Sequence, residues 1–175
     1  MLKFAAVLVA FSCVEARLFG RQAGNAAACP TDEELIKSAQ DFDLCMYRET
    51  LSKKICWDYN LKSSDAQADV ESVGGDYAVL LAGGCLTQTQ CDGLFEKQLE
   101  RARQQKESFY GAEVGCQCAD YVLVDMVFAL GLAGVSHLNY FNNYIHQKLW
   151  EAAGSDLTVT MWDVTDRERC ERDAD

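Results

Sequence analysis

The amino-acid sequence predicts an all-α fold, a disulfide-stapled bundle of four to five helices with a short strand or an extended tail near the C-terminus. Three observations lead to this prediction. The chain of 175 residues contains one proline, Pro30, and proline is the residue that most strongly interrupts helices. Apolar residues recur at helical spacing in several segments, whereas strand-like alternation is not found before residue 156. An even set of cysteines follows an apolar start, which is typical of secreted, disulfide-linked proteins.

Residues 1–16 resemble a secretory signal peptide. Lys3 precedes a short apolar run over residues 4–11, and the small side chains of Val14 and Ala16 precede the expected cut. The apolar run is too short to cross a bilayer, which takes about 20 residues. We therefore predict cleavage after Ala16 and secretion to the extracellular space.

The cysteines predict the same compartment. Cleavage would remove Cys13 and leave an even number, which in a secreted chain predicts a disulfide framework. The cysteines expected to pair are Cys29, Cys45, Cys56, Cys85, Cys91, Cys116, Cys118 and Cys170. We expect a flexible lead-in over residues 17–28 and a single helical, disulfide-rich domain over residues 29–175. Zinc sites need paired Cys-x-x-Cys spacing or clustered histidines, and the sequence has neither, so no metal and no cofactor is predicted.

The first helix is expected to begin at Thr31. Thr31 and Glu34 have the spacing of a capping box, in which each side chain accepts a hydrogen bond from the backbone N–H of the other residue. An apolar face then follows at helical spacing: Leu35, Ala39, Phe42 and Met46. Residues 46–55 contain neither glycine nor proline, so the helix is predicted to continue through Cys56.

Cys45 and Cys56 are predicted to bond to different partners. On a continuous helix they would share one face but lie about 16 Å apart along the axis. Disulfide partners need Cα atoms within about 7 Å. Each cysteine would then tie the helix to another element.

Further helices follow at regular intervals. Ser64 and Gln67 predict a second capped start, and this helix should end at Gly74. Residues 65–76 carry acidic side chains at a spacing similar to that of a calcium loop, but they lack the glycine that makes its sharp turn, so no calcium site is predicted. After a short apolar stretch at residues 77–81, a longer helix is expected from Thr87 or Thr89 to near Gly111, with an apolar face: Cys91, Leu94, Phe95, Leu99 and Ala102.

Residues 119–135 are the most apolar part of the chain outside the predicted signal peptide. A helix that is apolar all round is normally the buried centre of a bundle, and this one is too short and too interrupted by Asp125 to span a membrane. Burying a bare carboxylate is costly, so Asp125 must be paired, hydrogen-bonded or neutral. A last helix is expected from Ser136 to near Gly154, followed by a strand or an extended tail over residues 155–164.

One segment resembles a known enzyme family over fewer than ten residues. Tyr110, Gly111, Gly115, Cys116 and Cys118 are similar to the glycine- and cysteine-rich calcium loop of secreted phospholipases A2. Those enzymes pair the loop with a His-Asp-x-Cys helix, and neither histidine of this chain is followed by aspartate. The resemblance implies a diverged secreted hydrolase as one alternative function.

The two histidines do not form a catalytic or metal-binding pair in this prediction. His137 and His146 are nine residues apart, which places them on opposite sides of one helix.

Net charge limits the class of partner. Cleavage after Ala16 removes one lysine and one glutamate, so the formal charge stays at −11. Nucleic acids and anionic lipids are bound by basic surfaces, so neither is expected, whereas a cationic partner is favoured. We expect a non-enzymatic extracellular interaction protein, such as an effector, toxin, signal or matrix component, that presents a rigid helical surface to a protein partner.

The second alternative is a carrier of a small apolar ligand. In this interpretation the long apolar helix and the helix after it line a cavity with Val124, Phe128, Tyr140, Phe141, Tyr144 and Trp150. A cavity of several hundred Å³ would favour the carrier, and a flat apolar patch would favour the interaction protein. The oligomeric state is left open.

Overall fold

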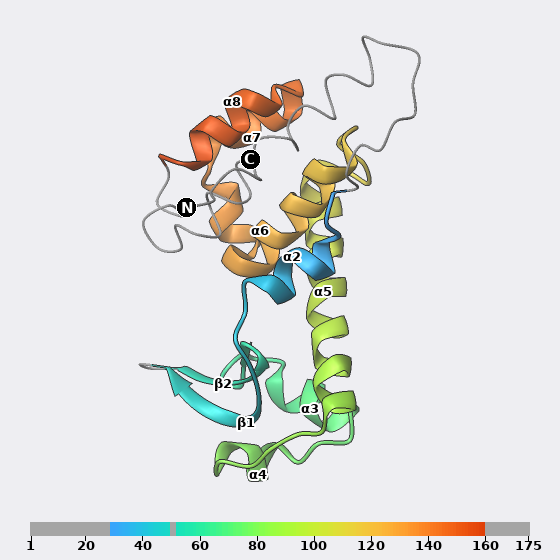
Figure 1. Ribbon diagram of the computed structural model, residues 1–175, viewed down its shortest axis with the longest axis vertical. Helices are drawn as coiled ribbons and strands as arrows, with labels where there is room; N and C mark the ends of the chain where they lie inside the picture. Colours follow the sequence, from blue (N-terminus) through green and yellow to red (C-terminus); the bar gives the residue numbers. More distant parts are fainter. Residues whose placement is uncertain (1–28, 50–51, 160–175) are drawn as a thin grey trace, which may run out of the picture. The chain divides into compact units, whose positions relative to one another are not determined.

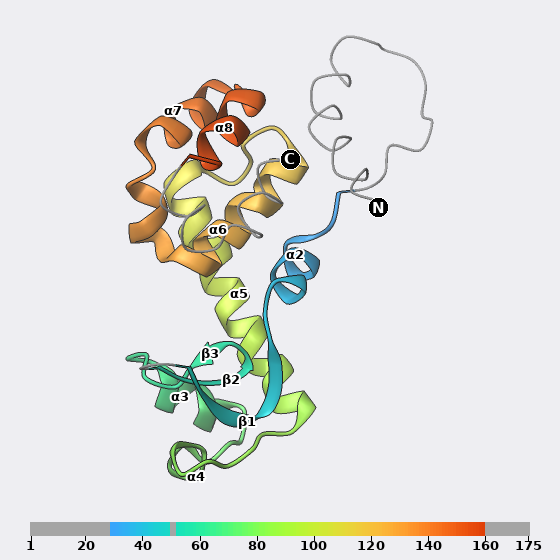
Figure 2. The same cartoon turned by 60° about the vertical axis from the view of Figure 1, so that its left-hand side comes forward.

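The computed structural model describes residues 29–49 and 52–159, so the predicted signal peptide, the lead-in and Cys170 lie outside the described residues. In these ranges the protein contains seven helices and three strands, and the all-α prediction is therefore wrong (Figures 1 and 2). The elements in chain order are α2 (Asp32–Ser38), β1 (Phe42–Glu49), β2 (Ser52–Trp57), β3 (Tyr59–Asn60), α3 (Ala66–Ser72), α4 (Tyr77–Leu81), α5 (Gln88–Tyr110), α6 (Gln117–Ser136), α7 (Asn139–Gln147) and α8 (Trp150–Leu157).

The described chain divides into two compact units. Residues Ile36–Arg101 form the sheet unit, and the described residues before and after them, 29–35 and 102–159, form the helical unit. Helices α2 and α5 each run from one unit into the other. Two compact units can still unfold as one, so a single domain over residues 29–175 stays a prediction.

The long first helix is the main error of the sequence prediction. Helix α2 ends at Ser38, and the chain then forms an antiparallel pair in which Phe42 lies opposite Trp57 and Glu49 lies opposite Ser52. Phe42 and Met46 fit a helical face, but with Leu44 they also alternate at the period of a strand. Leu44 and Met46 pack against the core of the sheet unit, while Phe42 stays 42% exposed, so the packing of these two side chains outweighs the helical pattern.

The segment between α4 and α5 forms backbone hydrogen bonds with the middle of β1. The register between β1 and β2 shifts between Asp43 and Tyr47, and there the backbone pairs instead with residues 84–86. The Met46 N–H donates to the Gly84 carbonyl at 3.0 Å, and the Leu86 N–H donates to the Leu44 carbonyl at 2.7 Å. Strand β1 is therefore paired with a segment about 40 residues further along the chain, and the Cys45–Cys85 disulfide joins the same two segments.

A closely packed core holds the sheet unit together. Its buried members include Ile55, Tyr59, Leu61, Val70, Leu80, Cys91 and Leu94. At its edge, the Trp57 ring lies between Phe42 and Phe95, at centroid distances of 4.5 and 5.3 Å. The Lys37 ammonium lies 4.4 Å from the Trp57 ring centroid, which is a cation–π contact.

Three disulfides connect residues of the described ranges: Cys29–Cys118 in the helical unit, and Cys45–Cys85 and Cys56–Cys91 in the sheet unit. The Cys56–Cys91 bridge is buried, with exposed fractions of 1% and 0%, and we call it the buried bridge. Cys116 also takes part in a disulfide. Intramolecular bridges of this kind are typical of an oxidising, extracellular or secretory environment.

Cys45 and Cys56 do bond to different partners, as predicted, but for another reason. They lie on β1 and β2, not on two heights of one helix. Cys45 on β1 bonds to Cys85, just before α5, and Cys56 on β2 bonds to Cys91 within α5.

The helical unit contains the second half of α5 together with α6, α7 and α8. The long apolar helix is present as α6, but Gly131, with φ of +69°, introduces a kink near its end. The single helix predicted from Ser136 to Gly154 is wrong, because Lys148 adopts a left-handed conformation and ends α7, and Gly154 lies inside α8. The strand or tail predicted over residues 155–164 begins inside α8, and its residues from 160 lie outside the described residues.

By length and composition alone, α6 is apolar enough to cross a membrane, a test that the core helix of a soluble protein also passes. Six of its residues are buried inside the protein, and one of these is the carboxylate Asp125, at 0% exposure. Only a third of its apolar window is buried. With 20 residues the helix is long enough to span, so the prediction that this segment is too short to cross a membrane is wrong, and its role as the buried centre of a bundle stays a prediction.

Candidate functional site

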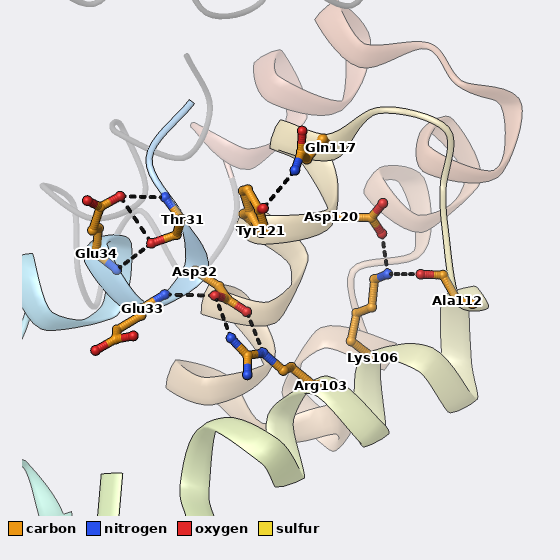
Figure 3. A network of polar contacts seen from close by, with 10 residues as sticks. All are labelled: Thr31, Asp32, Glu33, Glu34, Arg103, Lys106, Ala112, Gln117, Asp120 and Tyr121. Carbon is orange, nitrogen blue, oxygen red and sulfur yellow. Dashed lines mark hydrogen bonds and ion pairs between the residues drawn. The ribbon is translucent and has the colours of Figure 1, made fainter. Parts of the chain in front are cut away.

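The helical unit contains a polar network around the first turn of α2 (Figure 3). The predicted capping box is present. The Thr31 N–H donates to Glu34 Oε2 at 2.8 Å, and the Glu34 N–H donates to Thr31 Oγ1 at 3.2 Å. The backbone hydrogen bond from Thr31, with that from its hydroxyl, lowers the pKa of Glu34. These bonds fix where α2 begins and orient the residues beside it.

Asp32 and Arg103 form a two-pronged ion pair in this network. Arg103 Nε donates to Asp32 Oδ2 at 2.8 Å, and its second nitrogen donates to Oδ1 at 2.9 Å. Asp32 is 3% exposed, whereas the Arg103 side chain is 45% exposed. Paired donors of this kind match a carboxylate in geometry as well as charge. The pair joins α2 to the second half of α5.

Lys106 lies on the next turn of α5 and is 4% exposed. Its ammonium forms an ion pair with Asp120 and donates to the Ala112 carbonyl at 3.0 Å (Figure 3). It also donates to the Gly111 carbonyl at 3.3 Å. An ammonium has three N–H donors, and three acceptors surround it here. Asp120 in turn accepts from the Val114 N–H at 3.3 Å. Lys106 thus holds the loop between α5 and α6 closed.

This geometry bears on the resemblance to a calcium loop. Gly111 and Gly115 both have a φ of +92°, a conformation that glycine adopts without strain. The carbonyl of Gly111 faces the ammonium of Lys106, which is a cation supplied by the chain itself. Among the described residues, no three His, Cys, Asp or Glu side chains are grouped to hold a metal ion.

The sheet unit has its own buried polar network on α3 and α5. Asp69 is 5% exposed, and it accepts a hydrogen bond from the Tyr59 hydroxyl at 2.7 Å and another from Arg101 at 2.5 Å. Burial alone would raise the pKa of Asp69, but the hydrogen bonds from Arg101 and Tyr59 outweigh it and hold the pKa below its ordinary value. Burial, together with the bond to Asp69, raises the pKa of Tyr59. This carboxylate therefore stays ionised and serves to connect elements.

A surface pocket of about 450 Å³ lies where α3 turns into α4. Its lining residues are Gln67, Glu71, Gly75, Asp76, Tyr77, Ala78 and Leu81, all in the sheet unit. The sequence predicts a helix that ends at Gly74 and a short apolar stretch at residues 77–81 in this segment, with neither a calcium site nor a pocket. The signal that could have indicated a pocket is the Gly74–Gly75 break between two short helices with a carboxylate on each side.

The residues predicted to line an apolar cavity differ in their surroundings. Val124 and Phe141 are buried, at 5% and 2% exposure, whereas Tyr140 is 73% exposed. Phe128, Tyr144 and Trp150 are partly buried. None of these six lines the pocket at α3 and α4.

The two histidines lie on different elements. His137 is the C-terminal cap of α6, and His146 lies on α7 with its ring 5.8 Å from that of Tyr110. Tyr110 itself is hydrogen-bonded to Asn142, and burial raises its pKa.

No known protein family matches the chain, and no curated protein is significantly similar to it in sequence. The buried ion pairs in both units are engaged with partners inside the protein. The pocket at α3 and α4 lies at the surface, and the exposed carboxylates of Glu71 and Asp76 are part of its lining.

Proposed function

We propose that this protein is a secreted, non-enzymatic interaction protein that works outside the cell as an effector, toxin, signal or matrix component. The observation that carries the proposal is the set of three intramolecular disulfides, one in the helical unit and two in the sheet unit. A disulfide stabilises a fold by roughly 2–4 kcal/mol, mainly by restricting the unfolded chain. Such cross-links suit a protein that must keep one surface shape without help from the cell.

The use of the buried charges supports a binding role over a catalytic one. Lys106, Asp120 and Asp69 would be natural acids and bases if they were poised for chemistry. Each is instead held by partners that connect secondary-structure elements. Buried polar groups that are fully hydrogen-bonded make a fold rigid and specific.

A binding assay on intact surfaces tests the proposal. The full chain is expressed through a secretory pathway, and the secreted product is labelled and applied to cells and extracellular matrix. We expect saturable binding that unlabelled protein displaces and that protease treatment of the surface removes, because the partner is a protein. Non-saturable uptake of the label, or turnover of an ester substrate at an enzymatic rate, would contradict the proposal. Co-purification of a lipid in defined ratio would favour the carrier instead.

A further inference from the structure

The pocket in the sheet unit has one wall of backbone at Gly75. The chain between α3 and α4 passes through Gly75, where a Cβ atom would lie 2.8 Å from Leu86 Cδ2 and 2.8 Å from Val70 Cγ1. Any side chain there would displace core residues, since Val70 and Leu86 are both buried. At Gly75 the wall of the pocket is therefore backbone packed against the core.

Both charged residues that line the pocket are acidic, and both are held in place. Gln67 Nε2 donates to Glu71 Oε1 at 2.8 Å, and the Val79 N–H donates to Asp76 Oδ1 at 3.0 Å. Each of these contacts involves one carboxylate oxygen, and a carboxylate can accept several hydrogen bonds. The two carboxylates are thus oriented by the protein and retain capacity for a ligand.

The rest of the lining is aromatic or apolar. The Tyr77 hydroxyl donates to the Leu61 carbonyl at 2.6 Å, which anchors the ring at the pocket. Ala78 and Leu81 add apolar surface, and the neighbouring Val79 is 54% exposed. Lysine and arginine side chains combine an apolar stem with a cationic head, which matches this mixture of surfaces.

We propose that the pocket between α3 and α4 binds an arginine or lysine side chain of the partner protein, with the cationic head against Glu71 and Asp76 and the stem along Ala78 and Leu81. This inference rests on the proposed function, because it names the partner's contacting group. The net charge of −11 acts in the same direction, since an acidic protein draws basic partners towards it over long range.

Nuclear magnetic resonance titration of the ¹⁵N-labelled secreted protein with N-acetyl-arginine amide tests the site directly. N-acetyl-citrulline amide is the matched probe, because it has nearly the shape of arginine without its charge. We expect arginine, and the corresponding lysine compound, to shift the amide signals of residues 71–81 with millimolar affinity, and citrulline to leave them unchanged. Binding should weaken as ionic strength rises from about 0.01 M to about 1 M, over which the screening length falls from about 30 Å to about 3 Å.

Isosteric variants separate the pocket from a general effect of acidic charge. Glu71→Gln and Asp76→Asn should each weaken arginine binding about two- to fivefold, as expected for exposed ion pairs. Asparagine also caps helices well, so Asp76→Asn should keep α4 folded. Glu96→Gln removes the same charge from an exposed position on α5 that does not line the pocket, and it should leave binding unchanged. Equal shifts with citrulline, or equal weakening by Glu96→Gln, would overturn the assignment.

The outcomes for pocket and function are distinguishable. Saturable binding to surfaces without arginine-dependent shifts at residues 71–81 would overturn the pocket and leave the proposed function standing. Arginine-dependent shifts without saturable surface binding would support the pocket and contradict the proposed function.

Discussion

Lys106→Met should destabilise the helical unit more than any exposed lysine substitution. Methionine keeps most of the apolar stem but removes the ammonium that faces Asp120 and the carbonyls of Gly111 and Ala112. Removing one partner of a buried ion pair costs about 3–5 kcal/mol, because the other charge is left without compensation. The Asp120 side chain is 18% exposed and would regain some water. We therefore expect a loss of about 2–3 kcal/mol in the free energy of unfolding, below the fully buried case.

Urea denaturation followed by circular dichroism measures this loss as a lower midpoint at unchanged slope. Gln105→Met is the control, since Gln105 is exposed on the same helix in the same unit, and it should change stability by less than about 0.5 kcal/mol. The double variant with Asp120→Asn should be more stable than the sum of the two single losses predicts, because it no longer buries an unpaired charge. A Lys106→Met protein within about 0.5 kcal/mol of the native one, the range of ordinary surface substitutions, would refute this account of the network.

Three further predictions concern pH and redox behaviour. The folded pKa of Asp69 lies below its ordinary value, so its contribution to stability is present above about pH 4 and is lost as the pH falls towards the folded pKa. Asp69→Asn should therefore reduce the pH dependence of the free energy of unfolding between about pH 2 and pH 5. Burial raises the pKa values of Tyr59 and Tyr110, so ultraviolet titration of the native protein should show two phenols that ionise only above the ordinary range of about pH 10. Ionisation of these two phenols within that range would contradict the burial. Mild reductant should reduce Cys45–Cys85 before the buried bridge of the sheet unit, because Cys85 is exposed and thiol exchange needs access to the sulfur. Peptide mapping after timed alkylation gives the order of reduction. Reduction of the buried bridge first would contradict this prediction.

Local signals in the sequence were reliable for two of three predicted helix starts. The start predicted from Ser64 and Gln67 is wrong in detail, because the N-cap of α3 is Asp65, which makes no side-chain cap hydrogen bond. The capping box at Thr31 and Glu34 forms as predicted. The helix expected from Thr87 or Thr89 is present as α5, with the Gln90 side chain accepting from the Thr87 N–H at 2.9 Å. Such caps involve residues three apart, so their physics is contained in a few consecutive letters.

The sheet could not be predicted from the same kind of signal. Phe42 and Met46 satisfy both a helical and a strand pattern, and the choice between them depends on distant partners. Cys85 bonds to Cys45 across 40 residues, and the backbone beside it pairs with β1. Tertiary contacts of this range routinely override local preference.

The pocket was missed for a related reason. Glu71 and Asp76 are ordinary as letters, and they become a site only because the chain folds tightly at Gly75 against Val70 and Leu86. The close approach of backbone to core is a tertiary property. The acidic residues between 65 and 76 look like one group in the sequence, but they do not form one site. Asp69 points inward and accepts hydrogen bonds from Tyr59 and Arg101.

The native mass of the secreted, unreduced protein tests secretion, the disulfide framework and the absence of a small ligand in one experiment. We predict a chain that begins at Arg17, contains four disulfides, gains no mass on alkylation and carries no bound small molecule. A stoichiometric lipid would contradict the interaction protein in favour of a carrier. A product that stays inside the cell with its first 16 residues attached and free thiols present would contradict secretion itself.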